Sequence, residues 1–121
     1  MKRFSKIFML LLFLLNFSAA FAQKYYDEQW KKVAANSQKG AYKSNLPIIS
    51  EIQKQAMKDN NIVQLIQSLK AEFSIINRTQ DDEKNDMASQ FFNKLTDIEK
   101  PLKGNDRIFF EVLLNSFFLD Y

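Results

Sequence analysis

The stretch that decides the fold is IVQLIQSLKAEFSII, residues 62–76. Its apolar side chains recur at intervals of three and four residues, which places them on one face of an α-helix. A β-strand would instead require strict alternation with a period of two. We therefore expect a helix with a buried face formed by Ile62, Leu65, Ile66, Leu69, Phe73 and Ile76.

Two helices are predicted before this stretch. The first is expected at about residues 25–39, followed by Gly40, a residue type that suits the position just past a helix end. The second is expected to begin at the cap candidates Ser44 and Asn45. The Asp-Asn-Asn run at 59–61 then breaks the pattern and offers a cap for the helix that follows.

Two more helices are predicted after it. The acidic residues at 81–83 suit the positive first turn of a fourth helix, which Lys100 and Pro101 end. The last segment, residues 108–121, is apolar on nearly every side, and such a helix is expected to have neighbours on every side. The buried face of the fourth helix is expected to comprise Ala88, Phe91, Phe92, Leu95 and Ile98.

Helix starts near 45, 62, 81 and 105 with short connections predict an all-α fold of successive antiparallel helical hairpins. This layout resembles a TPR-like α-helical repeat array, in which each helix pair buries its face against the next. We interpret the chain as truncated at its C-terminus, where a longer polypeptide would add another helix. The candidate partner-packing surface is formed by Phe110, Phe117, Phe118 and Tyr121.

The first 22 residues have the pattern of a secretory signal peptide. A positively charged start precedes an apolar run at 7–17, and Ala20 and Ala22 frame an A-x-A cleavage site. The mature chain is then expected to begin at Gln23, whose side-chain amide can cyclise once the residue is terminal. We expect a helical domain at 23–121 that is exported to the periplasm, the cell envelope or the medium.

The net charge of +3 comes from the leader. Three basic residues, Lys2, Arg3 and Lys6, lie in it and no acidic residue does. Of the 17 basic and 14 acidic residues in the chain, the 99 residues after the leader therefore keep 14 of each sign. A formally neutral domain gives no support for nucleic-acid binding, and contact with a membrane is expected only through the signal peptide.

The chain contains no cysteine and no histidine. This composition excludes thiol nucleophiles, Ser-His triads, zinc sites built on Cys or His, and haem ligation by His. The acidic run at 81–86 has neither the glycine at the sixth position nor the glutamate at the twelfth that a calcium loop requires, and we interpret it as a helix start. No catalytic residue, cofactor or metal is expected, and the chain is predicted not to be an enzyme.

Two further patterns allow alternative interpretations. Tyr25, Tyr26 and Trp30 could form a platform for a carbohydrate or peptide, but their helical spacing favours core packing, with Tyr25 left exposed. The tripeptide Asn77-Arg78-Thr79 matches a glycosylation sequon, a match that arises often by chance.

Several segments together resemble a known family. They are YDEQWKKV at 26–33, Lys-Gly at 39–40, Lys-Ser at 43–44, AMKDNN at 56–61 and QLIQSLK at 64–70. The combination resembles the amino-terminal helical region of large secreted bacterial alpha-2-macroglobulin-family proteins. In that region a YD-x-x-WK-x-[VI] helix is followed by a KGLxxSA corner and a KxxNxxQLIKAL helix.

The resemblance implies a role in a family that entraps proteases, using a bait segment and, in many members, a thioester between Cys and Gln. A thioester cannot be assigned to a chain without cysteine. The implied role is a non-catalytic scaffold or interaction region of an exported protein, whose inhibitory parts lie elsewhere and whose partners are other domains of the same polypeptide. The alternative is a free-standing TPR-like module that binds an envelope protein or peptide in the groove between hairpins.

Overall fold

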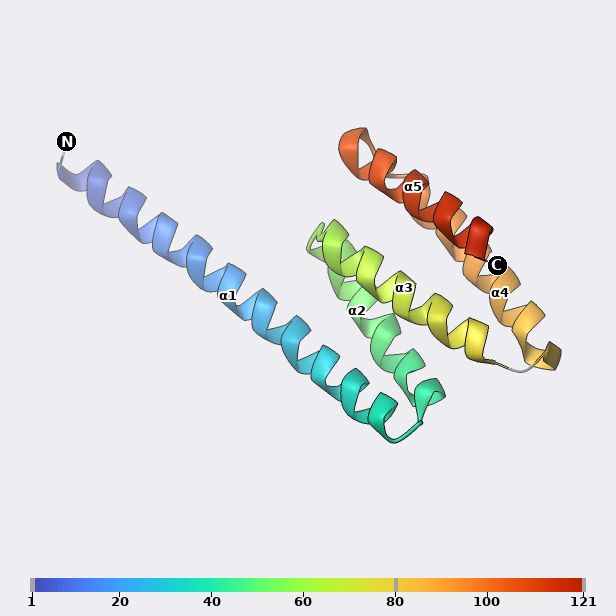
Figure 1. The fold of residues 1–121 in the computed structure, drawn as a ribbon. Helices are drawn as coiled ribbons and strands as arrows, with labels where there is room; N and C mark the ends of the chain where they lie inside the picture. Colours follow the sequence, from blue (N-terminus) through green and yellow to red (C-terminus); the bar gives the residue numbers. More distant parts are fainter. Residues whose placement is uncertain (1, 80, 121) are drawn as a thin grey trace.

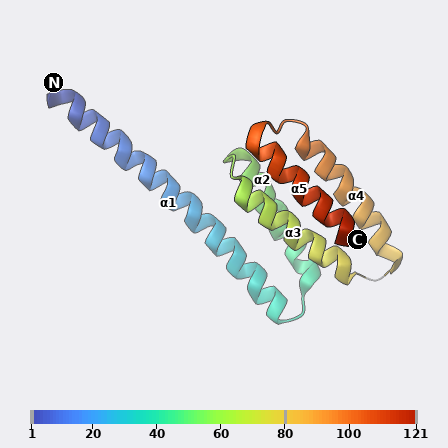
Figure 2. The ribbon, with the colours of Figure 1, turned by 45° about the horizontal axis from the view of Figure 1, so that its top comes forward.

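The computed structural model describes residues 2–79 and 81–120, with side chains described for residues 6, 21–79, 82–117 and 119. The chain is all-α, as predicted, and the described residues include no strand. Adjacent helices pack as antiparallel pairs (Figures 1 and 2). The elements are α1 (Lys2–Gln38), the short 3₁₀ turn η1 (Tyr42–Asn45), α2 (Leu46–Lys58), α3 (Ile62–Arg78), α4 (Asp81–Glu99) and α5 (Gly104–Asp120).

Helix α1 is much longer than the predicted segment at 25–39. It runs without a break from Lys2 through the expected leader, and its first half extends away from the other helices in Figures 1 and 2. The reason is local, because no glycine or proline occurs before Gly40 to end the helical hydrogen-bonding pattern. Among the described residues, no helix has an apolar run long enough to cross a membrane.

Helix α1 ends at Gln38, and Gly40 lies just past the helix end, as predicted. The backbone φ of Gly40 is +74°, a left-handed conformation that glycine adopts without steric cost. The N–H of Ala41 donates to the carbonyl of Asn36 at 2.9 Å, and the N–H of Gly40 donates to that of Ser37 at 3.0 Å. These two bonds form a Schellman motif, which satisfies carbonyls that a helix end leaves free.

The predicted caps of the next two helices have different outcomes. Asn61 caps α3 as expected, since its side-chain oxygen accepts a hydrogen bond from the backbone N–H of Gln64 at 3.2 Å. Asn45 occupies the predicted cap position directly before α2, but its buried side chain makes no capping bond to that helix. It instead accepts a hydrogen bond from Asn36 and donates one to Ser37, so it holds the end of α1 against the start of α2.

Helix α3 lies at the centre of the core, between α2 on one side and α4 and α5 on the other. Of its predicted face, Leu65, Leu69, Phe73 and Ile76 are buried, and Ile62 and Ile66 pack partly buried against them. The ring of Phe73 lies 4.6 Å from that of Phe117 and 5.8 Å from that of Phe91, between ring centroids. The core therefore comprises one cluster to which all the helices contribute: Tyr26, Ile52, Ala56, Leu65, Leu69, Phe73, Ile76, Ala88, Phe91, Leu95, Ile98, Phe110, Leu113 and Phe117.

Helix α5 begins at Gly104, whose φ is +62°, close to the predicted start near 105, and it includes the apolar segment at 108–120. Its apolar residues divide between two sides. Phe110, Leu113 and Phe117 face the core. The prediction that α5 has neighbouring helices on every side is not met among the described residues, where it packs against other helices on one side only. The large apolar side chains left exposed on α5 include Ile108, Phe109, Val112 and Leu119.

Candidate functional site

Two of the segments that resemble the macroglobulin family, YDEQWKKV and AMKDNN, meet where α1 lies beside the corner between α2 and α3. Tyr26 is fully buried, and its hydroxyl donates a hydrogen bond to Oδ2 of Asp59 at 2.6 Å. These residues are 33 positions apart, so the bond joins the YDEQWKKV segment to the AMKDNN segment. The prediction of core packing is confirmed for Tyr26, while Tyr25 is half-buried against it rather than fully exposed.

Trp30 makes the second contact at this corner. Its indole Nε1 donates a hydrogen bond to Oε1 of Gln64 at 2.7 Å, while its ring packs partly buried against the core. Gln64 is itself buried, and a buried amide oxygen without a donor would lose the hydrogen bonds it makes to water. The two bonds therefore fix both the position and the rotation of α1 on the rest of the domain.

Replacing Tyr26 with phenylalanine is expected to lower the free energy of unfolding by about 1–2 kcal/mol at neutral pH, because it removes a hydrogen bond to a carboxylate and keeps the ring. Burial and the hydrogen bond to Asp59 raise the pKa of the Tyr26 hydroxyl well above its ordinary value. Above about pH 10 the unfolded chain loses this proton while the folded chain keeps it, so stability falls as the pH rises.

Urea unfolding of the wild type and Tyr26→Phe at pH 7, 9, 10 and 11 measures both effects. The difference in the free energy of unfolding between the two proteins should be constant up to about pH 9 and should become smaller above pH 10. Tyr25 also has a raised pKa, through burial and the nearby Glu51 and Asp59 carboxylates, and it contributes equally to both proteins. If this difference instead became larger with rising pH, the loss of stability at high pH could not be assigned to the raised pKa of Tyr26.

A second polar contact joins the helix pairs through Lys94 of α4. Its ammonium contacts both carboxylate oxygens of Glu72 on α3 and donates to Oε1 of Gln53 on α2 at 3.0 Å. The side chain of Glu72 is only 15% exposed and that of Lys94 35%. Nε2 of the buried Gln53 has no partner among the described atoms. Through these contacts the Lys94 ammonium links α2, α3 and α4, which gives this side chain a structural role.

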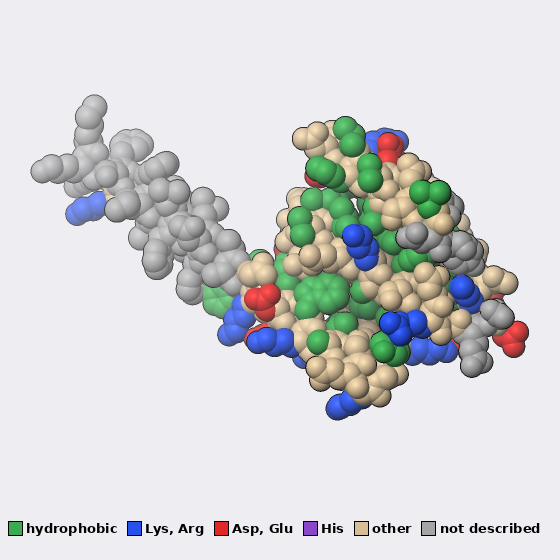
Figure 3. All heavy atoms as spheres, in the orientation of Figure 1, with side chains coloured by type: hydrophobic (Ala, Val, Ile, Leu, Met, Phe, Trp, Pro, Cys, Tyr) green, Lys and Arg blue, Asp and Glu red, His purple; other side chains and the backbone are tan. Residues whose placement is uncertain are grey.

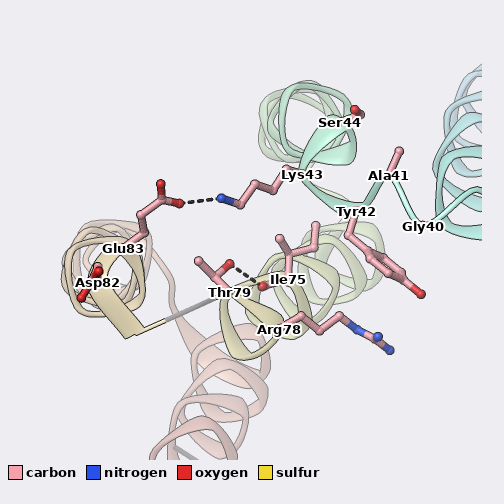
Figure 4. A pocket seen from close by; sticks show the side chains of 10 residues that line it. All are labelled: Gly40, Ala41, Tyr42, Lys43, Ser44, Ile75, Arg78, Thr79, Asp82 and Glu83. Carbon is pink, nitrogen blue, oxygen red and sulfur yellow. Dashed lines mark hydrogen bonds and ion pairs between the residues drawn. The ribbon is translucent and has the colours of Figure 1, made fainter.

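A shallow pocket of about 530 Å³ lies at the opposite corner, beside the start of α4 (Figure 4). Lys43 reaches across it to Oε2 of Glu83 at 2.5 Å, and the guanidinium of Arg78 lies 4.5 Å from the centre of the Tyr42 ring. In Figure 4 the Arg78 side chain points away from the Lys43–Glu83 pair. The lining residues are Gly40, Ala41, Tyr42, Lys43, Ser44, Ile75, Arg78, Thr79, Asp82 and Glu83.

The groups in this pocket are already engaged with one another. The hydrogen bond from Lys43 holds the pKa of the Glu83 carboxyl below its usual range, so Glu83 is an ionised acceptor and not a proton donor at neutral pH. The Thr79 hydroxyl of the sequon donates to the carbonyl of Ile75 at 2.9 Å. In the part of the chain that the structure describes, no group of three or more acidic side chains is arranged to hold a metal ion.

Of the four residues predicted to form a partner-packing surface, the structure describes the side chains of Phe110 and Phe117, and both are buried. Phe110 and Phe117 are in the core, and the Phe117 ring packs edge-on against Phe91 at 5.4 Å. The side chain of Phe118 and the whole of Tyr121 lie outside the described residues. Exposed apolar side chains on α5 are instead Ile108, Phe109, Val112 and Leu119, and hydrophobic side chains are visible at the surface in Figure 3.

The predicted cleavage site falls within α1. Ala22 is half-buried and packs against the core, whereas Gln23 is exposed. The Nε2 of Gln23 donates to Oδ1 of Asp27 at 2.9 Å. The side chain of Ala20 lies outside the described residues.

Comparison with known proteins returns no relative for this chain: no protein-family model, no curated protein and no solved structure matches it. The macroglobulin resemblance thus depends on the motif residues of the sequence alone.

Proposed function

We propose that the chain is exported and serves as a non-catalytic helical scaffold and interaction region of an alpha-2-macroglobulin-like protein of the cell envelope. In this proposal the leader directs export and is removed after Ala22. The helical domain then packs against other parts of the same polypeptide, which carry the inhibitory chemistry.

The contact between the family-like segments carries the proposal. The aromatic residues of the first segment are hydrogen-bonded to polar residues of the later ones, as the bonds from Tyr26 to Asp59 and from Trp30 to Gln64 describe. Residues buried in such contacts position helices and are not free to bind a substrate. A motif built from these residues therefore has an architectural role, which is the role that a scaffold region requires.

The outer side of α5 supports the interaction part of the proposal. Ile108 and Val112 are each more than half exposed, on the side of the helix opposite the buried Phe110 and Phe117, and Phe109, also more than half exposed, lies between the two sides. A helix that is apolar on two opposite sides is typical of an interior position in a helical array, where it has a neighbour on each side. We propose that this side of α5 contacts a further helix, with the repeat arrangement of a TPR-like array.

The proposal is tested on the natural protein, with an antibody raised against residues 23–121. Cells are fractionated, and the polypeptide that reacts is sized by immunoblot and identified by mass spectrometry of its peptides. The expected result is an exported polypeptide many times longer than the 99 residues left after leader removal, with β-rich sequence following the helical domain.

A leader variant provides the control. Ala22→Leu places a large side chain where signal peptidase requires a small one, so this variant should keep its leader and stay membrane-associated. A wild-type polypeptide that remains in the cytoplasm with its leader would overturn export. An exported polypeptide of only 99 residues would overturn the proposal that the chain is a scaffold region of a longer protein, and would establish a free-standing protein.

That second outcome corresponds to the other candidate function, a free-standing TPR-like module that binds an envelope protein or peptide. The exposed apolar side chains of α5 favour it, since an apolar helix face is the type of surface that receives an amphipathic partner helix. The two candidates differ in what covers this face: a helix of the same polypeptide in the first, a separate chain in the second.

A further inference from the structure

Gln23 occupies an unusual position in α1. The cleavage proposed above makes it the first residue of the mature chain, so the present inference depends on that proposed export and processing. Gln23 and Lys24 are exposed, Tyr25 is partly buried against the core, and Tyr26, held by Asp59, is the first fully buried side chain of the mature chain. Tyr26 follows the new terminal residue by three positions, which is less than one helical turn.

Cleavage removes the hydrogen bonds that now hold Gln23 in a helix. The backbone N–H groups of residues 23–26 would lose the carbonyls of residues 19–22, which depart with the leader, and the first four N–H groups of a helix have no intrahelical partner. The side-chain amide of Gln23 is held only at the surface, by its bond to Asp27. Once this exposed bond to Asp27 is released, the new α-amine and the side-chain amide can approach each other.

We propose that Gln23 is a modification site at which the mature N-terminus closes into a pyroglutamyl lactam. The α-amine nitrogen attacks Cδ of the side-chain amide, and an N–Cδ bond forms. The Cδ–Nε2 bond breaks, and Nε2 leaves as ammonia with the proton given up by the amine. No oxidant, reductant or co-reactant is consumed.

The electrostatics of α1 favour the product. An α-ammonium group at residue 23 would lie at the positive end of the helix and beside the charged Lys24. Ring closure replaces that ammonium with a neutral amide, which removes an unfavourable charge from the first turn. It also leaves no free amine for an aminopeptidase, so the turn that leads to Tyr26 and Trp30 is protected from trimming.

The test uses the full chain with its leader, expressed in a bacterium that exports it and recovered from the periplasm after incubation at 37 °C. The expected N-terminal peptide starts at residue 23 and is lighter than the glutamine form by the mass of one ammonia. Pyroglutamyl aminopeptidase should release one residue from it, and a general aminopeptidase should release none.

Gln23→Ala is the matched control, because it keeps the cleavage site and cannot form the ring. Its terminus should have the unmodified mass and should be open to the general aminopeptidase. A wild-type peptide that starts at residue 23 and keeps the full glutamine mass would overturn the modification and leave the proposed export intact. A chain that still starts at Met1 would overturn the proposed export, and the modification with it.

Discussion

Phe110→Ala is expected to lower the free energy of unfolding by about 3–5 kcal/mol, a large part of the 5–15 kcal/mol typical of a single domain. The Phe110 side chain is 0% exposed and belongs to the core cluster that α5 shares with α3 and α4. Truncation removes its buried apolar surface and leaves a cavity in the core cluster that the surrounding side chains fill only in part. Urea unfolding followed by circular dichroism measures the loss.

Phe109 is the matched control, because it is the same residue type one position away on the same helix. Its side chain is 60% exposed, so Phe109→Ala is expected to change the free energy of unfolding by less than about 0.5 kcal/mol. Equal losses for the two variants would contradict the orientation of α5 described above.

The second large effect is expected for Lys94→Met, which removes the ammonium and keeps a long apolar stem. The Glu72 carboxylate, with a side chain only 15% exposed, and the Oε1 atom of Gln53 would both lose their donor. Breaking a fully buried pair costs about 3–5 kcal/mol, and since Lys94 is 35% exposed we expect about 2–3 kcal/mol here. Adding Glu72→Gln should restore part of this loss, because a neutral amide leaves no unpaired buried charge.

The surface pair between Lys43 and Glu83 is the control for this prediction. Their side chains are 61% and 65% exposed, so Lys43→Met removes an ion pair of the same kind from a solvated position. A loss below about 1 kcal/mol is expected for it. Chemical denaturation of all four proteins under one set of conditions makes the comparison, and a Lys94→Met loss no larger than that of Lys43→Met would show that the Glu72 contact contributes nothing beyond a surface pair.

Helix identity was predictable because periodicity is a local property. The stripe at 62–76 predicted α3 and its buried face, and the aromatic spacing of 91–98 did the same for α4. The start of α1 was not predictable, since a leader rich in helix-forming residues continues smoothly into the domain. The position of Asn45 before α2 was predictable, but its side-chain bonds to Asn36 and Ser37 of α1 were not, because they form only when α1 docks there.

The contacts of the candidate site were less predictable than the helices. Tyr26 and Trp30 were expected in the core, but nothing in the spacing indicated that Asp59 and Gln64 would receive their hydrogen bonds. Glu72 and Lys94 are 22 residues apart, and each alone has the pattern of an ordinary surface charge. Such pairs arise only when helices dock, because separations of this size are not neighbours on any one helix.

The sequence by itself determined the all-α class, the position of α3, the glycine end of α1 at Gly40 and the absence of thiol and imidazole chemistry. These properties follow from local periodicity, backbone conformation and composition. The tertiary structure alone decided which side of α5 is buried, since Phe109 and Phe110 are chemically identical and the helix is apolar on both sides. The choice depends on the surface that α3 and α4 together present, and burial against that surface is a property of the whole fold.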